Sequence, residues 1–151
     1  MTSNTVQSAR VDFPGGKRVD AAIGAHVLHT DQSAEHGGEG NAPEPFDLFL
    51  GSLATCAGAY VLGFCQARGI ATEGLWLSQE SRFAEGKLRE IRVEVHVPQS
   101  FPEKYLVAVR AAAGGCRVKK VLAEPPQITV EVEREPGAGG NETAVRGAPR
   151  L

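Results

Sequence analysis

Uncharged residues fill the stretch between Asp47 and Arg68, which also contains no proline. This pattern predicts an uninterrupted helix of about six turns over residues 45–68. Pro45 suits the first helical position, and Gly69 follows as a common C-terminal signal. Apolar side chains occupy every face, which is typical of a helix buried on all sides or placed in a membrane. Small residues recur four apart and favour close approach of another helix: Gly51, Thr55, Ala59 and Gly63.

Alternating apolar and polar residues predict strands on both sides of this helix. The strands expected before it are residues 6–13, 18–23 and 25–28, with a turn at 14–16. Those expected after it are residues 75–83 and 88–97. A second helix is expected from about residue 100 to 113, a third over 116–122, and a last strand over 127–134. This order predicts an α+β fold in one domain, residues 1–135, with a disordered tail over 136–151.

The composition argues against several classes of protein. A formal net charge of −2 gives no general attraction to nucleic acid or to an anionic membrane. Residues 48–65 are just long enough to span a membrane, but three glycines, a serine, a threonine and two cysteines weaken that interpretation. The N-terminal ten residues contain no apolar run and therefore no signal peptide. We expect a cytoplasmic protein with no membrane or nucleic-acid partner.

Three cysteines without a secretory signal favour thiol chemistry or simple burial over a disulfide framework. Cys56 lies about 16 Å along the long helix, beyond the reach of the helix dipole. It is either a small core residue or a nucleophile whose thiolate needs a cation from elsewhere in the fold. Cys116 opens the third helix and precedes Arg117 and two lysines. A lowered thiol pKa is expected there, unless Cys116 merely fills a gap beside a solvated face.

Cys65 follows Cys56 by nine residues, which places it on the opposite helix face and about 13.5 Å along the axis. A disulfide needs Cα atoms about 4.4 to 6.8 Å apart, so these two cysteines cannot pair within one helix. We expect Cys65 to be a packed residue. If a redox pair exists, it is Cys56 with Cys116.

Metal ligands are not suggested by the spacing of the candidate residues. The sequence has no CxxC or HExxH motif. The histidines at positions 26, 29 and 36 are irregularly spaced along a polar segment, which is typical of solvated side chains. We therefore expect no metal and no other cofactor.

Two segments carry a resemblance to a known family. One is GGEGNAPEPFDLFLGSLATC, residues 37–56, and the other is CRVKKVL, residues 116–122. With the order of elements expected over residues 10–133, they make the chain resemble the OsmC/Ohr family of osmotically inducible and organic-hydroperoxide-resistance proteins. The resemblance implies an OsmC-like fold, with antiparallel sheets around a long central buried helix. It also implies that two chains interlock into a homodimer.

The activity implied by the resemblance is that of a thiol-dependent peroxidase. Cys56 would attack the O–O bond of a hydroperoxide, organic or hydrogen peroxide, and Cys116 would condense with the resulting sulfenic acid into a disulfide. A dithiol reductant, lipoyl or another thiol, would restore both cysteines. An arginine of the N-terminal strands would stabilise the thiolate; Arg18 is the first candidate and Arg10 the second, although a hairpin surface also accounts for either. The substrate pocket would be shaped by Phe46, Leu53 and Tyr60.

One position departs from the family pattern. Phe46 stands where the organic-hydroperoxide branch has a glutamate that orients the arginine. Asp47 matches an acidic position of other branches but projects away from Cys56, and Glu44 is another candidate substitute. The departure motivates a second hypothesis, an OsmC-fold small-ligand-binding or accessory protein without peroxidase activity. A general thiol–disulfide oxidoreductase is a third, weakened by the absence of CxxC.

Overall fold

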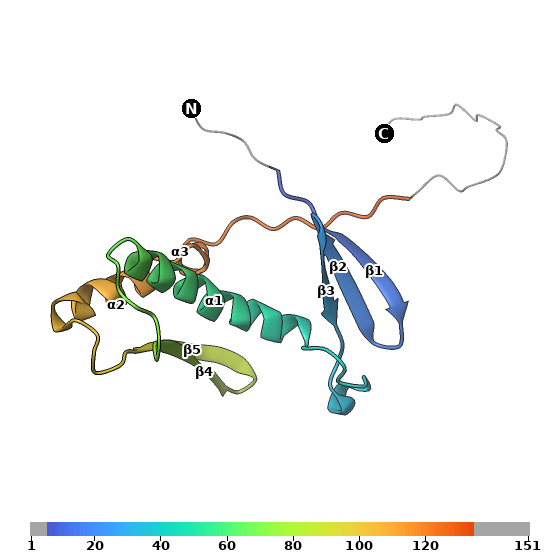
Figure 1. Ribbon diagram of the computed structural model, residues 1–151. Helices are drawn as coiled ribbons and strands as arrows, with labels where there is room; N and C mark the ends of the chain where they lie inside the picture. Colours follow the sequence, from blue (N-terminus) through green and yellow to red (C-terminus); the bar gives the residue numbers. More distant parts are fainter. Residues whose placement is uncertain (1–5, 135–151) are drawn as a thin grey trace, which may run out of the picture.

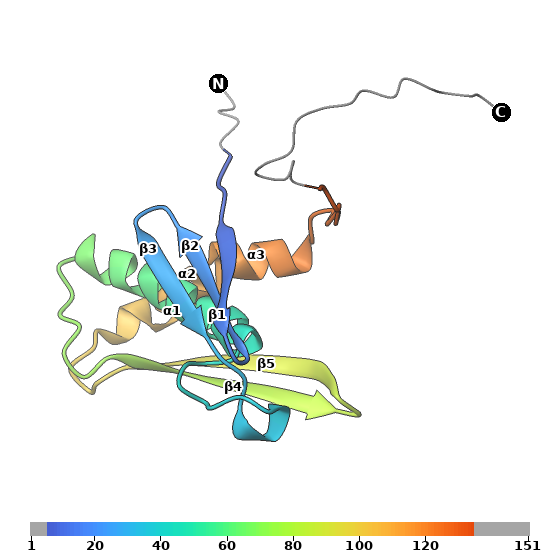
Figure 2. The ribbon, with the colours of Figure 1, turned by 90° about the vertical axis from the view of Figure 1, so that its right-hand side faces the viewer.

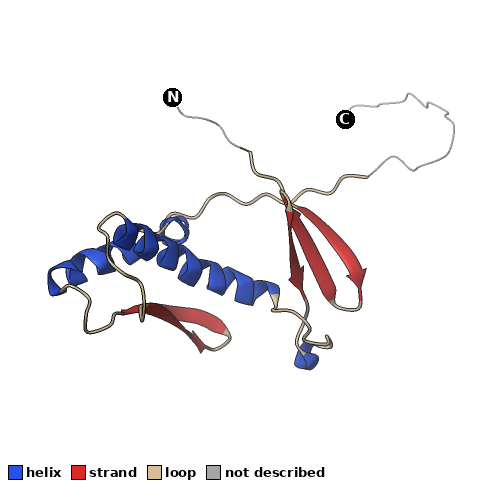
Figure 3. Ribbon diagram, in the orientation of Figure 1, coloured by secondary structure: helices blue, strands red, loops and turns tan. Residues whose placement is uncertain are grey.

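The computed structural model describes residues 6–134, which fold into helices and two antiparallel sheets. This confirms the predicted α+β class. A long helix crosses the molecule, and two shorter helices and a β-hairpin lie along it (Figures 1 and 3). A three-stranded sheet stands beyond the N-terminal end of the long helix, and Figure 2 views the molecule from that end.

The three-stranded sheet consists of β1 (Arg10–Gly15), β2 (Arg18–Ile23) and β3 (His26–Thr30), paired antiparallel in that order. The turn was predicted over residues 14–16, but Pro14 and Gly15 still belong to β1 and the turn lies at Gly16 and Lys17. The φ angles of Gly15 and Gly16, 128° and 61°, favour glycine. Successive residues of a strand point to opposite faces of the sheet. One face therefore carries a row of polar side chains opposite one another: Asp12, Asp20 and His29. The other face is apolar and includes Val11, Phe13 and Leu28, which are largely exposed.

A tightly folded loop connects this sheet to the long helix. The carboxylate of Asp31 is buried and accepts hydrogen bonds from the backbone N–H groups of Gln32 at 2.8 Å and of Glu39 and Asn41 at 3.2 Å. These three bonds lower the pKa of Asp31 below its usual range, the bond from Asn41 contributing most. A short 3₁₀ helix, η1 (Ala34–His36), lies inside the loop. The sequence pattern alone predicted only an irregular polar segment here.

The long helix is α1 (Pro45–Gln66). Pro45 occupies its first turn as predicted, and Glu44 is the N-cap residue. Glu44 and Asp47 form a capping box, in which each side chain accepts a hydrogen bond from the backbone N–H of the other residue. By length and composition α1 is able to cross a membrane. In this fold it packs against the hairpin and both shorter helices, as a core helix does.

Only one face of α1 is buried within the chain. Its buried residues follow one another at intervals of four: Leu53, Ala57, Val61 and Cys65. The small residues Gly51, Thr55, Ala59 and Gly63 all lie on an exposed face. The expectation of a helix buried on all sides is therefore wrong for the single chain, because the hairpin and the shorter helices cover one side only.

The buried face of α1 packs against elements that follow it in the sequence. They are β4 (Trp76–Ala84), β5 (Lys87–His96), η2 (Glu103–Tyr105), α2 (Leu106–Gly114) and α3 (Arg117–Ala123). The alternating residues Ile91, Val93 and Val95 turn toward the core as predicted. Two apolar clusters result, one around Val61, Cys65, Phe101 and Val109, and the other around Leu53, Ala57 and Cys116.

The predicted last strand does not form within the single chain. Residues 127–134 pair with no neighbouring strand among the described residues, and Ile128, Val130 and Val132 are 83%, 87% and 94% exposed. The alternating pattern is typical of a strand, but a strand also needs a partner, and residues 6–134 supply none here. The predicted tail, residues 136–151, lies outside the described residues.

Gly38 provides a test of the loop. A Cβ atom at this position would lie 2.0 Å from the backbone oxygen of Gln32. We expect Gly38→Ala to lower the free energy of unfolding by about 1–3 kcal/mol, because the loop must open to relieve the overlap. Thermal unfolding measures the effect, with Glu35→Ala in the same loop as the control. Equal melting temperatures for both variants would contradict this account of the loop.

Candidate functional site

The structure brings Cys56 and Cys116 together. Cys56 lies in the middle of α1, and Cys116 is the N-cap residue of α3. Both pack in the cluster that contains Leu53 and Ala57, together with Val118 from the first turn of α3. Cys116 is fully buried, whereas Cys56 is partly exposed. Two sulfurs sixty positions apart in the chain therefore meet where α3 packs against α1.

The link between α2 and α3 determines where Cys116 is placed. Gly115 ends α2, and its backbone N–H is directed to the last carbonyl groups of that helix. The chain then turns at once into α3, and the sulfur of Cys116 accepts a hydrogen bond from the backbone N–H of Lys119 at 3.4 Å. A side chain that accepts from the third residue of a helix is an N-cap. The cap fixes the Cys116 sulfur against α1.

The first turn of α3 lowers the pKa of the Cys56 thiol. The largest effect comes from the backbone N–H of Val118, with further contributions from the N–H of Arg117, the Cys116 thiol and the Arg117 charge. Burial acts in the opposite direction. N–H groups and a cation favour the thiolate over the neutral thiol. Cys56 therefore becomes the nucleophilic thiolate at a lower pH than an ordinary cysteine does.

This arrangement corrects one detail of the sequence prediction. Cys116 does begin a helix, as predicted, and accepts a hydrogen bond from the Lys119 N–H, but the N–H groups of Arg117 and Val118 act on Cys56 instead. The cation that acts on Cys56 within the chain is Arg117. The pattern gave no sign of this, because it did not reveal that α3 packs beside the middle of α1.

Cys65 lies in a different environment. It is fully buried in the cluster with Val61, Phe101 and Val109, on the opposite face of α1 from Cys56, as the helical spacing predicted. Burial raises the pKa of its thiol, and the charge of Arg68 offsets part of this effect. Cys65 is therefore kept neutral and away from solvent.

The two arginines predicted near the thiolate lie on the three-stranded sheet. Arg10 pairs with Asp12 at 3.1 Å, and both side chains are exposed. Arg18 is less exposed and pairs through Nη2 with Asp20 at 3.2 Å. Neither arginine is among the groups that act on Cys56 within the single chain.

An apolar stripe on α1 leads to Cys56. At about 100° per residue, Phe46, Leu53 and Tyr60 all lie within about 80° of Cys56 around the helix axis. Phe49, which is not among the predicted pocket residues, belongs to the same stripe; its position seven residues before Cys56 is the sequence signal for this. Phe46 stacks on Phe49 with ring centroids 5.5 Å apart and meets Phe83 edge-on at 6.2 Å. The three aromatic side chains of the stripe are 39–47% exposed.

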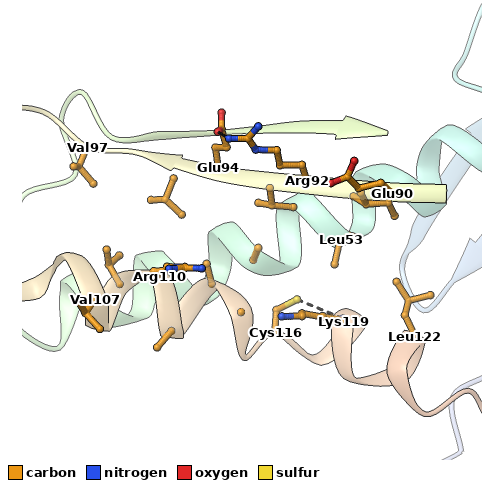
Figure 4. A pocket seen from close by; sticks show the side chains of 18 of the residues that line it. Leu53, Glu90, Arg92, Glu94, Val97, Val107, Arg110, Cys116, Lys119 and Leu122 are labelled. Atoms are coloured by element: carbon orange, nitrogen blue, oxygen red, sulfur yellow. Dashed lines mark hydrogen bonds and ion pairs between the residues drawn. The ribbon is translucent and has the colours of Figure 1, made fainter. Parts of the chain in front are cut away.

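An open groove of about 1310 Å³ lies between β5 and the helices α2 and α3 (Figure 4). Its floor includes Leu53, Ala57 and Cys116, and charged side chains such as Arg92, Arg110 and Lys119 stand along its sides. Of the three predicted pocket residues, Leu53 lines this groove, whereas Phe46 and Tyr60 lie on the exposed stripe instead.

The carboxylates near the start of α1 have local partners. Glu44 accepts hydrogen bonds from the Ser33 N–H at 3.0 Å and pairs with His36 at 2.9 Å. The contacts with Ser33 and then His36 lower the pKa of Glu44 to about 2, and Glu44 in turn raises the pKa of His36. Asp47 completes the capping box. Both carboxylates therefore secure the start of the helix, at a distance from Cys56 along it.

No group of three histidine, cysteine or acidic side chains within residues 6–134 is arranged to hold a metal ion. The chemistry of the described site lies in its two thiols. A sulfur with a lowered pKa is a nucleophile, and a second sulfur beside it is able to condense with an oxidised form of the first.

Comparison with known proteins shows the family of this chain. The model of the OsmC-like protein family matches residues 38–131, which include both cysteines and the helices that carry them. The chain belongs to the OsmC-like protein family. No functionally curated protein matches the sequence.

Solved structures share the OsmC-like fold. An osmotic stress induced and detoxification response protein of Psychrobacter arcticus is 22% identical, with a TM-score of 0.66, over 80% of this chain and 90% of that one. An OsmC-like protein of Mycoplasma pneumoniae is 17% identical, with a TM-score of 0.63, over 82% and 91%. The organic hydroperoxide resistance protein OsmC of Legionella pneumophila is 20% identical, with a TM-score of 0.55, over 80% and 91%. At these identities the likeness establishes the fold alone.

Alkylation tests the lowered pKa of Cys56. We expect its reaction with iodoacetamide to titrate at a lower pH than the value of about 8.5 for an ordinary thiol. Mass spectrometry of peptides from protein alkylated between pH 5 and 10 gives the rate for each cysteine separately. Cys65 is the internal control and should stay unmodified in the folded protein, because it is buried. A midpoint for Cys56 at or above 8.5 would contradict the account of α3 given above.

Proposed function

We propose that this protein is a cytoplasmic thiol-dependent peroxidase that reduces organic hydroperoxides or hydrogen peroxide. The observation that carries the proposal is the contact between a partly exposed thiol of lowered pKa, Cys56, and a second thiol, Cys116. The family membership is consistent with this reaction, because its solved members include a protein named for organic hydroperoxide resistance.

The proposed reaction has three steps. The Cys56 thiolate attacks the terminal oxygen of ROOH, the O–O bond breaks, and the products are Cys56 sulfenic acid and an alkoxide that takes up a proton to become ROH. The Cys116 thiol then attacks the sulfenic sulfur, forming the Cys56–Cys116 disulfide and releasing water. A dithiol reductant, lipoyl or another, reduces the disulfide and is itself oxidised to a disulfide.

The different exposures of the two sulfurs suit this order. A peroxide reaches Cys56, which is partly exposed, before it reaches Cys116, which is fully buried. The exposed side chains of Phe46 and Tyr60, beside Cys56 on α1, offer apolar contacts to a substrate that carries a hydrocarbon group. Because Cys116 already packs against the same cluster, the condensation requires little movement of the backbone.

We further propose that the working unit is a homodimer with interlocked chains. A single chain leaves three apolar surfaces open: the small-residue face of α1, one face of the three-stranded sheet, and residues 127–134. A Cβ atom added at Gly51 or Gly63 would meet nothing within 4 Å, so packing inside the chain does not require glycine there. A second copy that packs its own α1 closely against this face accounts for both observations.

The dimer would also complete the site. Cys56 lies at the border between the buried face and the small-residue face of α1, so a second copy on the small-residue face comes next to its sulfur. We propose that Arg18 of this second copy supplies a guanidinium to the Cys56 thiolate. A desolvated guanidinium stabilises a thiolate far more than a screened charge does.

Peroxide titration tests the proposed activity. One equivalent of cumene hydroperoxide or hydrogen peroxide should consume two thiols of the reduced protein and give a Cys56–Cys116 disulfide, identified by mass spectrometry. Cys56→Ser should abolish peroxide consumption, Cys116→Ser should leave the sulfenic acid trapped, and Cys65→Ser is the matched control with unchanged turnover. An unmodified Cys56 after exposure to excess peroxide would refute the proposal.

The proposed dimer is tested by Ala59→Arg. Ala59 lies on the small-residue face and is exposed in the single chain, so the change is compatible with the folded monomer. We expect size-exclusion chromatography with light scattering to give a dimer for the wild-type protein and a monomer for this variant. Ala84→Arg, at the exposed end of β4, is the control and should stay dimeric. A dimeric Ala59→Arg protein would argue against packing through this face.

Phe46 keeps a second function open. The proposed alternative is an OsmC-fold protein that binds a small apolar ligand or a partner and has no peroxidase activity. The observation in its favour is that neither Phe46 nor the capping residues Glu44 and Asp47 offers a carboxylate beside Cys56. A Cys56 pKa of 8.5 or above, together with saturable binding of an apolar fluorescent probe in the groove, would favour this alternative.

A further inference from the structure

The polar face of the three-stranded sheet holds a cluster of charged side chains outside the cysteine site. Asp20 lies at its centre, with only 15% of its side chain exposed. One carboxylate oxygen, Oδ2, contacts the Arg18 guanidinium at 3.2 Å and the His29 Nδ1 at 2.8 Å. The other oxygen, Oδ1, is buried without a hydrogen-bond partner among residues 6–134. A buried carboxylate oxygen without a hydrogen-bond partner lowers the stability of a protein, and native structures contain few such atoms.

Asp20 holds the Arg18 guanidinium by one hydrogen bond and leaves most N–H donors of Arg18 unused. A guanidinium has five N–H donors, and in the described part of the chain the only hydrogen bond of the Arg18 side chain joins Nη2 to Asp20. The side chain of Arg18 remains 41% exposed, so it is fixed at one corner and accessible at the others. Arg10 differs, because its partner Asp12 is itself 58% exposed and holds it in solvent.

Other carboxylates of this region already have partners and are not available to hold the Arg18 guanidinium. The charge of Arg18 also lowers the pKa of Asp31, but the oxygens of Asp31 already accept three backbone N–H groups. Glu44 is bound to Ser33 and His36. Position 46 carries Phe46, which packs on aromatic rings.

We propose that Asp20, itself held by His29, is the positioning residue that orients the Arg18 guanidinium toward the Cys56 site of a second copy. This inference rests on the proposed function, in which Arg18 stabilises the thiolate. Asp20 does not touch the reacting atoms; it acts through Arg18. The carboxylate that orients the arginine in this chain then comes from the same strand as the arginine, and the helix position occupied by Phe46 is free to contact an apolar substrate.

The experiment compares Arg18→Met, Asp20→Asn and the double variant, with Asp12→Asn as the matched control on the same face of the sheet. Each protein is first shown to be folded and of wild-type oligomeric state. The readouts are the rate of Cys56 oxidation by cumene hydroperoxide at pH 7 and the pH midpoint of Cys56 alkylation. We expect Asp20→Asn to lower the oxidation rate about 10-fold to 100-fold, because a misplaced group costs a factor of that order. The double variant should be no slower than Arg18→Met, and Asp12→Asn should be unchanged.

The direction of the effect separates positioning from simple charge. If Asp20 only weakened the field of Arg18, its neutralisation would raise the rate and lower the alkylation midpoint, and that result would overturn the inference. An unchanged rate, or an additive loss in the double variant, would overturn it too. If Arg18→Met itself has no effect while Cys56→Ser abolishes oxidation, the roles of both Arg18 and Asp20 are refuted and the thiol chemistry stands. His29→Gln provides a second variant; it should give a smaller loss in the same direction, and a gain would contradict the proposal.

Discussion

The packing of the first turn of α3 against the middle of α1 is the contact on which the site depends. It places the Cys116 sulfur in the cluster with Leu53 and Ala57, and it brings the N–H groups of Val118 and Arg117 to Cys56. Neither helix alone would produce this site. The middle of a long helix lies too far from the helix N-terminus for the dipole to lower the pKa of a thiol. A short helix is only marginally stable in isolation and needs packing against the rest of the fold. Together they make a thiol of lowered pKa with a second thiol beside it.

A second constraint is the mismatch between the length of α1 and the amount of chain available to cover it. The hairpin and the shorter helices bury one face, while the face that contains Gly51 and Gly63 stays open, with space around both glycines. The three-stranded sheet extends beyond the end of α1 and does not cover that face (Figure 1). A single chain thus leaves this face of α1 uncovered, and this open face is the observation behind the proposed dimer.

Local features of the sequence predicted the elements well where a local cause determines them. Pro45 and the uncharged run that follows predicted α1, the alternation around Val93 predicted β5, and the segment before Cys116 predicted the break between α2 and α3. The pattern failed where the cause is tertiary. Residues 127–134 have the alternation of a strand but no strand to pair with in the part of the chain that the structure describes, and the burial of α1 depends on what surrounds it. The same distinction holds for the site. Helical spacing predicted that Cys65 and Cys56 lie on opposite faces of α1, whereas the roles of Val118 and Arg117 depend on a contact between distant segments.

The lowering of the Cys56 pKa by α3 has a thermodynamic counterpart. Because the folded pKa lies below the unfolded one, ionisation of Cys56 stabilises the folded chain above the ordinary thiol pKa, and this contribution is lost as pH falls through the lowered value. The same linkage runs in reverse along the folding reaction. In a chain that is still being synthesised, or whose α3 has come away, Cys56 is an ordinary thiol that is mostly protonated at neutral pH. The lowered pKa of Cys56 is thus a property of the folded chain, which appears only once α3 has packed against α1.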